Sequence, residues 1–225
     1  TGAEALVRRI KPDGTIISPI DFIPVYEKSG LISRLDRYIW EQAAAKLGEW
    51  KKAGINMSIS VNISPKDFYY IDIFNTFAGL IKKYDIEPSN LKIEITETTI
   101  MSDVPNLMGE LEELRKAGFT LEMDDFGSGY SSLNTLKDIN VDVLKVDMGF
   151  IKETKNVKKS RIILASVIKM AKELNLLIIT EGVETEEQVD NLTKLGCDVF
   201  QGYYFSKAID VNEFEKRYLY RKKAG

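Results

Sequence analysis

The sequence contains no histidine and a single cysteine, Cys197. Without an imidazole base, the chain cannot build a Ser-His-Asp or Cys-His nucleophile. Zinc and iron sites that depend on histidine or on several thiolates are excluded for the same reason. One cysteine cannot form an internal disulfide, and its rarity fits a reducing compartment. We therefore expect any site chemistry to come from carboxylates, amides, lysine, arginine and a hard metal ion.

Long charged and long apolar runs are also missing. The net charge is −3, and the longest basic runs, at 158–159 and 221–223, are short, so no nucleic acid polymer is expected as a partner. No stretch approaches eighteen apolar residues, and the N-terminus lacks a signal-peptide pattern. We therefore expect no membrane contact by this domain. The expected location is cytoplasmic, either alone or as the cytoplasmic part of a larger, membrane-anchored protein.

Short runs rich in β-branched residues alternate with helical patterns along the chain. At 225 residues with 44% hydrophobic content, the chain suits one domain, 1–225. The predicted strands are 2–10, 57–63, 91–96, 119–124, 141–147, 176–181 and 198–205. The predicted helices are 33–52, about 67–83, 104–117, 130–137, 160–174, 186–195 and one from 211, with Gly54, Gly118, Gly196 and Asn175 as end signals.

Strands alternating with helices indicate an α/β fold with a parallel sheet, and we predict a TIM-like (β/α)8 barrel. Such a barrel needs eight strands and the pattern supplies seven. We therefore expect that the first strand is missing from this chain and that the domain is N-terminally truncated. A doubly wound open sheet is the alternative, but it predicts a Gly-rich phosphate fingerprint after the first strand, which the sequence lacks.

Each predicted strand ends in polar residues, which a barrel would bring to one rim. A polar strand exit is common, and LEMDDFGSGYSS at 121–132 can be a plain turn, since Asp, Gly and Ser are turn formers. The repetition along the chain favours a site instead. The candidate residues are Glu4, Arg8, Asn62, Glu94, Glu97, Asp124, Asp125, Lys145, Asp147, Glu181, Glu184 and Gln201.

This candidate rim carries eight carboxylates but two cationic side chains, Arg8 and Lys145. Like charges so close together are costly unless cations separate them. Carboxylate and amide oxygens favour Mg²⁺ or Mn²⁺, with Ca²⁺ as a further occupant. A network of salt bridges is the alternative, and it is short of cations. Two divalent ions would support phosphodiester hydrolysis. A glycosidase is another possibility, but it needs just two acids.

Motifs along residues 2–215 resemble those of EAL-domain cyclic di-GMP phosphodiesterases. They are EAL at 4–6 followed by Arg8, FIPVYEKSGLI at 22–32, VNISP at 61–65, EITET at 94–98, DDFGSGYSSL at 124–133, LKVD at 144–147, TEGVET at 180–185 and QGYYFSK at 201–207. Each motif alone is weak, but their order and spacing together are specific. Ser128 stands where the family usually has Thr, which keeps the hydroxyl.

The resemblance implies a role for each candidate residue. Glu4, Asn62, Glu94 and Asp124 would bind one Mg²⁺ or Mn²⁺, Asp125 would be shared with a second ion, and Glu184 would lie near that ion. Lys145 and Glu181 would orient or deprotonate the attacking water. Glu97 would brace the loop at 126–133. Arg8 would contact a substrate phosphate, and Asp147 and Gln201 would complete the polar shell around cyclic di-GMP.

The implied reaction opens cyclic di-GMP to linear pGpG, with Ca²⁺ as an inhibitory occupant of the metal sites. The resemblance also implies a homodimer through the 126–136 region and an upstream sensory or GGDEF domain in the full-length protein. The alternative function is a catalytically inactive EAL-like receptor or scaffold module that binds the nucleotide without cutting it. The two functions differ in whether pGpG appears when the metal is supplied.

Overall fold

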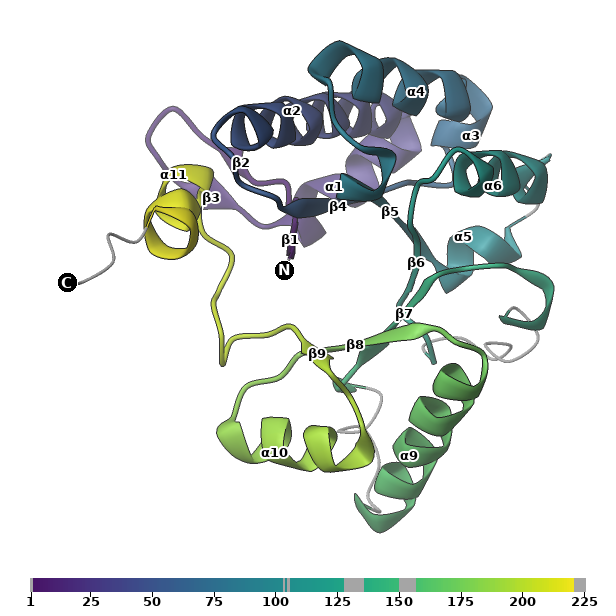
Figure 1. Ribbon diagram of the computed structural model, residues 1–225. Coiled ribbons are helices and arrows are strands. Elements are labelled where there is room, and N and C mark those ends of the chain that lie inside the picture. The colour runs from purple at the N-terminus through teal and green to yellow at the C-terminus, as the bar shows by residue number, and fades with distance from the viewer. Residues whose placement is uncertain (1, 103, 105, 128–135, 150–156, 221–225) are drawn as a thin grey trace. The chain divides into compact units, whose positions relative to one another are not determined.

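A computed structural model describes residues 2–102, 104, 106–127, 136–149 and 157–220 (Figure 1). The strands of the main sheet follow the order β1-β4-β5-β6-β7-β8-β9. The pairings β1–β4, β4–β5, β5–β6, β6–β7 and β8–β9 are all parallel. The chain divides into two compact units, residues 1–144 and residues 145–225. Strand β7 (Val143–Asp147) begins in the first unit and ends in the second.

The first unit contains the strands β1 (Gly2–Glu4), β4 (Ser58–Asn62), β5 (Leu91–Thr96) and β6 (Leu121–Asp124). Successive side chains of a strand point to opposite faces of the sheet. On one face lie buried apolar side chains from three of the strands: Ile59, Val61, Ile93, Ile95, Leu121 and Met123. The other face carries the polar residues of the same strands. The sheet of this unit therefore has one face for packing and one for polar chemistry.

Helices in the described part of the first unit include α1 (Pro19–Ser29), α2 (Ile32–Lys52), α3 (Asp67–Tyr70), α4 (Ile73–Tyr84), α5 (Glu97–Met101) and α6 (Leu107–Lys116), with a 3-10 turn at Pro88–Asn90. Helix α2 packs against α4 and β4. The ring of Trp40 lies 4.9 Å from that of Phe77, which makes an edge contact with Phe119 at 5.7 Å. These aromatic rings form the core between the helices and the apolar sheet face.

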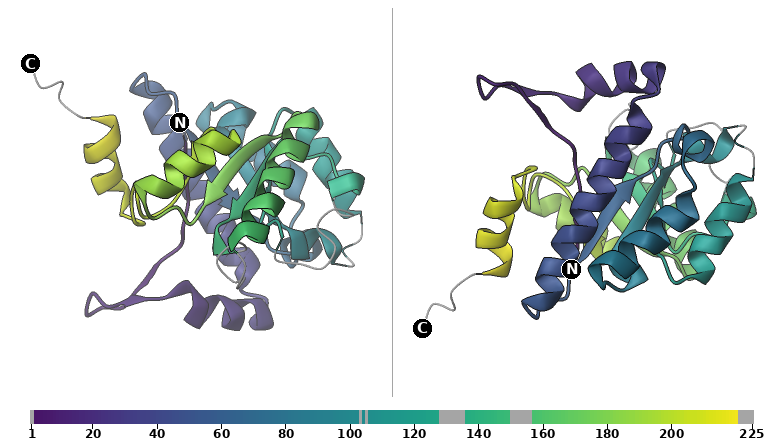
Figure 2. Two further views of the ribbon diagram at one scale, coloured as in Figure 1. Left: turned by 90° about the horizontal axis from the view of Figure 1, so that it is seen from below. Right: turned by 90° about the horizontal axis from the view of Figure 1, so that it is seen from above.

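The segment after Glu4 differs from the prediction of one strand over 2–10. The main-sheet strand ends at Glu4, and Arg9–Ile10 forms β2, which pairs antiparallel with β3 (Ile16–Ile17) as a separate hairpin. The hairpin and α1 extend away from the strands of the first unit (Figure 2). The sequence analysis also missed helix α1, although Pro19 occupies a helix N-terminal position where proline is favoured.

The second unit contains the end of β7, β8 (Leu177–Glu181), β9 (Val199–Phe200), α9 (Val157–Glu173), α10 (Glu186–Leu195), α11 (Val211–Phe214) and a π-helical turn at Glu215–Leu219. Helix α9 packs against β8. Helix α10 begins with a capping box between Thr185 and Gln188 and ends at Gly196 in the left-handed conformation. Both boundaries match the predicted helix 186–195.

The predicted strand 198–205 is much shorter in the structure, because β9 ends at Phe200. Gly202 has a φ of 154°, and a Cβ atom there would lie 2.2 Å from the carbonyl oxygen of Val183. The close approach of these two backbone segments ends the strand and requires glycine. Most of the predicted helix 130–137 falls outside the described residues. None of the helices in the described part of the chain is long and apolar enough to cross a membrane.

Candidate metal site and its polar neighbours

Asn62, Glu94 and Glu4 form an upper layer on the polar face of the first unit. Asn62 lies opposite Glu94 in the β4–β5 register, and Glu4 lies opposite Ser60, on the same face. The amide nitrogen of Asn62 donates to Glu4 Oε1 at 3.3 Å and to Glu94 Oε2 at 3.2 Å. Glu94 is 1% exposed. The structure thus brings three of the predicted metal ligands together around one amide group.

Ser60 and Lys92, two residues before Asn62 and Glu94, form a lower layer on the same face together with Glu122, which stands opposite Glu94 in the β5–β6 register. Lys92 Nζ makes an ion pair with Glu122 Oε1 at 2.8 Å, and Ser60 Oγ donates to Glu122 Oε2 at 2.8 Å. The Glu122 side chain is fully buried. Sequence reasoning missed this layer, although Lys92 and Glu122 precede Glu94 and Asp124 by the two-residue period of a strand.

Asp124 and Asp125 lie at the end of β6. Asp124 is half-buried and stands opposite Thr96 in the register, on the polar face. Its Oδ1 accepts the backbone N–H of Asp125 at 2.9 Å. Asp125 is exposed and has a φ of 56°, a left-handed conformation that aspartate tolerates better than most residues.

Across the described residues, no three acidic, histidine or cysteine side chains are arranged to hold one ion. The upper layer instead combines two carboxylates with the amide of Asn62, and Asp124 lies on the same face. An ion with three or more acidic ligands in this unit would require side-chain rearrangement. The set of oxygen donors is nevertheless the kind that Mg²⁺ and Mn²⁺ prefer.

Glu97 is the first residue of α5 and is 1% exposed. Its Oε2 accepts the backbone N–H of Gly127 at 3.4 Å. Thr96 caps the helix, since its Oγ1 accepts the N–H of Thr99 at 3.1 Å. Glu97 therefore contacts the start of the loop that it was expected to brace. Residues 128–135, which carry the rest of that loop and most of the predicted dimer region, lie outside the described residues.

Arg8 lies between β1 and β2 and is exposed. Its Nη1 donates to the neighbouring carbonyl of Val7 at 2.7 Å. Because the main-sheet strand ends at Glu4, Arg8 does not follow Glu4 along the same strand, as the prediction of one strand over 2–10 implied. This bond uses one of the five N–H donors of the guanidinium, and the side chain is exposed to solvent.

Lys145 and Glu181 form an ion pair in the second unit. Lys145 lies in β7 and is 1% exposed, and its Nζ lies 3.0 Å from Glu181 Oε1 at the end of β8. Asp147, at the end of β7, accepts the backbone N–H of Gly149. The backbone N–H of Met148 donates to the carbonyl of Glu181 at 3.1 Å. The two residues predicted to orient or deprotonate the attacking water therefore lie in contact, and the lysine of the pair is buried.

Glu184 and Gln201 lie on neighbouring loops of the second unit. The backbone N–H of Glu184 donates to Gln188 Oε1 at 2.6 Å, and the Glu184 residue is exposed. Gln201 follows β9; its N–H donates to the carbonyl of Thr180 at 2.9 Å, and its carbonyl accepts the N–H of Val183 at 3.1 Å. These backbone bonds tie the end of β9 to the end of β8, which also carries Glu181.

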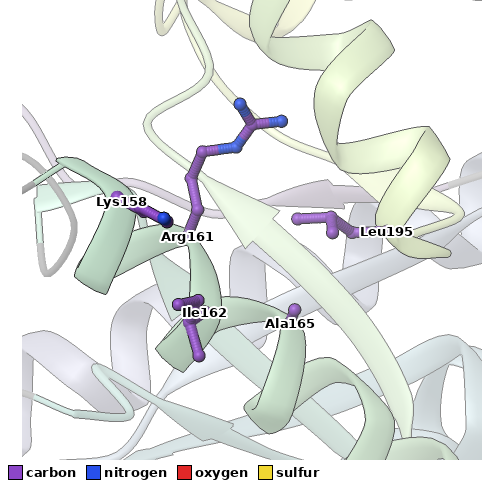
Figure 3. A pocket seen from close by; sticks show the side chains of 5 residues that line it. All are labelled: Lys158, Arg161, Ile162, Ala165 and Leu195. Carbon is purple, nitrogen blue, oxygen red and sulfur yellow. The ribbon is translucent and has the colours of Figure 1, made fainter.

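A hollow of about 600 Å³ lies on the surface of the second unit. Figure 3 shows its lining, which comes from α9 and the end of α10: Lys158, Arg161, Ile162, Ala165 and Leu195. Arg161 reaches across to Asn191 of α10 at 3.5 Å. None of the candidate site residues lines this hollow, so it is separate from the polar chemistry described above.

Parallel βα units and a face of carboxylates and amides at the strand ends define an α/β protein with a candidate oxygen-ligand site. The EAL domain family model matches residues 1–208. The chain therefore belongs to the EAL domain family, as the motifs indicated.

Two curated relatives cover nearly the whole chain. The bifunctional diguanylate cyclase/cyclic di-GMP phosphodiesterase MucR of Pseudomonas aeruginosa is 35% identical over 213 residues, which are 94% of this chain and 31% of MucR. The cyclic di-GMP phosphodiesterase PdeR of Escherichia coli is 33% identical over 221 residues, which are 97% of this chain and 33% of PdeR. This chain thus spans about a third of the length of these relatives.

Among solved structures, a complex of the PaMucR phosphodiesterase with c-di-GMP matches with a TM-score of 0.86 and 34% identity, over 94% of this chain and 86% of that chain. This similarity confirms the predicted fold class, a TIM-like α/β barrel. That structure is a complex with c-di-GMP.

Proposed function

We propose that this domain hydrolyses cyclic di-GMP to linear pGpG with the help of divalent cations. The observation that carries this function is the upper layer, in which Glu4, Asn62 and Glu94 converge on the polar face of the sheet. Membership of the EAL domain family supports the choice of substrate. Relatives named as cyclic di-GMP phosphodiesterases and a solved nucleotide complex support it further.

The residues of the upper layer fit a cation with oxygen ligands. The amide of Asn62 now presents its nitrogen to two carboxylates, and a half-turn of the amide would present Oδ1 in its place. Together with Asp124, these side chains would hold Mg²⁺ or Mn²⁺, and Asp125 and Glu184 would contribute to a second ion. Bound cations would lower the pKa of water and neutralise the charge of a phosphodiester.

Lys145 and Glu181 would manage the proton of the attacking water. A buried lysine held at 3.0 Å from a carboxylate is fixed in orientation, so it can donate a hydrogen bond to a water oxygen. Glu181 would accept the proton from the water as a general base. This assignment comes from the family resemblance and from the ion pair itself, and uses no distance between the two units.

Three further residues would complete the substrate site. Arg8 would leave the carbonyl of Val7 and bind a non-bridging phosphate oxygen, for which its guanidinium geometry is suited. Asp147 and Gln201 would form hydrogen bonds near the reacting phosphate. Glu97 would act indirectly, because it holds the backbone of Gly127 at the start of the loop.

The family resemblance also supports proposals about partners. A homodimer would form through the 126–136 region, and an upstream sensory or GGDEF domain would regulate the site in the full-length protein. The relative MucR, named as a bifunctional diguanylate cyclase/cyclic di-GMP phosphodiesterase, supports such an arrangement. We also propose a cytoplasmic location for this domain, as expected from the sequence.

The test is hydrolysis of cyclic di-GMP by the purified chain, with pGpG separated by chromatography. With Mg²⁺ or Mn²⁺ we expect pGpG, and with excess Ca²⁺ we expect inhibition, because the looser coordination of Ca²⁺ suits the site poorly. Lys145→Ala should abolish the reaction, whereas Glu87→Gln, which changes an exposed carboxylate, should not. If the wild type binds cyclic di-GMP but forms no pGpG with either metal, the receptor function replaces the enzymatic one.

A further inference from the structure

Helix α2 holds the backbone of Asn62 in place. Trp40 Nε1–H donates to the carbonyl of Asn62 at 2.9 Å, and the Trp40 side chain is completely buried. Because Trp40 is fixed by its packing on Phe77, this hydrogen bond anchors the end of β4 to the helix. The position of the Asn62 side chain in the upper layer therefore depends on how α2 and the segment after β4 fit together.

A second contact between α2 and this segment involves two acids, Asp36 and Asp67. Asp36 lies one helical turn before Trp40 on α2, and Asp67 is the first residue of α3 and completely buried. Asp67 Oδ2 accepts the N–H of Ser64 at 2.8 Å, and the N–H of Asp67 donates to the carbonyl of Ser64 at 3.0 Å. Asp67 therefore closes the turn that begins two residues after Asn62.

The other oxygen of Asp67 is buried without a hydrogen bond of normal geometry, and so is the hydroxyl of Ser33 on α2. Both Ser33 and Asp36 lie close enough to Asp67 to influence its carboxyl group. Buried polar groups in this state need a proton or another partner between them. A proton shared between the carboxyl groups of Asp36 and Asp67 gives Asp67 this missing hydrogen-bond partner.

Burial, followed by the negative charges of Asp67 on α3 and Glu27 on α1, raises the pKa of Asp36 to about 9. Burial also raises the pKa of Asp67, although the nearby hydroxyl of Ser33 and the backbone N–H of Ser64 oppose the rise. At neutral pH the pair therefore keeps one proton. When the pH rises through the pKa of Asp36, that proton passes to solvent and the half-buried Asp36 carboxylate faces the buried carboxylate of Asp67.

We propose that Asp36 and Asp67 form a proton-dependent latch that positions Asn62, so that loss of the shared proton loosens the 63–67 turn and weakens metal binding. The role of Asn62 as a ligand rests on the proposed function, whereas the latch itself does not. Asp36 and Asp67 are positioning residues, since neither contacts the ions or the substrate.

The raised pKa of Asp36 makes the folded state less stable as the pH rises. The folded-state pKa of Asp36 lies above the ordinary value of 3.8, so the folded state binds more protons than the unfolded state between these two pH values. The stability that the pair contributes is complete below about pH 4 and falls as the pH rises, until it is lost above about pH 9.

The first experiment follows the protection of the Ser64 amide against hydrogen exchange, corrected for intrinsic rates, from neutral pH to one unit above the pKa of Asp36. At that upper pH about a tenth of the molecules keep the proton, so we expect protection in the wild type to fall by about tenfold. Asp36→Asn and Asp67→Asn keep an amide donor in the pair at every pH and should remove the fall. Glu49→Gln, an exposed change on the same helix, should retain it.

The second experiment measures Mg²⁺ affinity over the same pH range by calorimetry. Ordinary carboxylate ligands are already ionised at neutral pH, so without the latch the affinity should not decrease on going to higher pH. We expect it to decrease by about tenfold in the wild type and to stay level in Asp36→Asn.

Either of two results would overturn the latch: a constant Ser64 protection in the wild type, or an equal fall in both Asn variants. Falling protection with unchanged Mg²⁺ affinity would refute the positioning of Asn62. The protection measurement needs neither metal nor nucleotide, so failure to hydrolyse cyclic di-GMP would count against the proposed function alone.

Discussion

On one face of the sheet, the upper and lower layers surround their carboxylates with different hydrogen-bond and ion-pair partners. In the lower layer, Glu122 receives a lysine and a hydroxyl, one at each carboxylate oxygen. In the upper layer, Glu4 and Glu94 share the amide of Asn62 at 3.3 and 3.2 Å. The lower layer has its cation built into the sequence, whereas the upper layer offers oxygen ligands to a cation.

This difference assigns the lower layer to the stability of the fold and the upper layer to function. A buried ion pair with both oxygens satisfied can serve the fold, although its net contribution is small compared with the cost of breaking it. A carboxylate pair bridged by an amide is a weaker arrangement for the fold, because it keeps like charges close together. We therefore expect lower-layer changes to alter unfolding and upper-layer changes to alter metal binding and hydrolysis.

The largest expected effect is on activity. Glu94→Gln removes the charge of a buried upper-layer residue while keeping its shape, and we expect hydrolysis of cyclic di-GMP to fall by about a thousandfold, more than the 10- to 100-fold typical of groups outside the ligand shell. The folded state should persist, as measured by circular dichroism. Activity within tenfold of the wild type would remove Glu94 from the set of ligands.

The next effect is on stability. Lys92→Met leaves the fully buried Glu122 without its cation, and we expect the free energy of unfolding to fall by about 3 kcal/mol. The double variant Lys92→Met with Glu122→Leu should regain most of the loss, since replacing both partners removes the uncompensated charge. Urea denaturation measures both variants. If the single variant loses less than the double variant, the lower layer is not a structural ion pair.

Metal binding gives the third effect. A ligand present at a hundred times its dissociation constant stabilises the state that binds it by about 2.7 kcal/mol. We expect Mg²⁺ to raise the midpoint of thermal unfolding in the wild type and in Ser60→Ala. The rise should be absent in Glu94→Gln. An equal rise in all three proteins would place the ion away from the upper layer.

The smallest effect concerns the hydroxyl of the lower layer. Ser60→Ala removes the donor to Glu122 Oε2 while the lysine remains, and we expect a loss of about 1–2 kcal/mol in the free energy of unfolding. Hydrolysis should remain within a fewfold of the wild type. A large loss of activity at unchanged stability would show that the two layers are coupled, contrary to the separation proposed here.

The strand order and several boundaries could be predicted from the sequence. The prediction 91–96 matches β5, because alternation and β-branched residues mark a strand buried on its apolar face. The prediction 198–205 was too long, since the signal that ends β9 is the contact of Gly202 with Val183, which is distant in sequence. Helix α1 was missed because Pro19 and Pro24 suppress a helical pattern.

The residues of the candidate site could be predicted from the sequence better than their arrangement in space. Asn62 and Glu94 were chosen for their places at strand ends, and the register puts them opposite each other. The latch between Asp36 and Asp67 could not be predicted, because two acids on separate helices carry no local signal. Arg8 was expected beside Glu4, but the sequence does not show that the main-sheet strand stops there.

The most direct measurement of the central claim is the anomalous scattering of Mn²⁺ in crystals of the wild type and of Glu94→Gln. We predict a peak bounded by Glu4, Asn62 and Glu94 in the wild type, with the Asn62 amide turned to present Oδ1, and no peak there in the variant. A wild-type crystal in saturating Mn²⁺ with no peak at these side chains, or an equal peak in Glu94→Gln, would contradict the account.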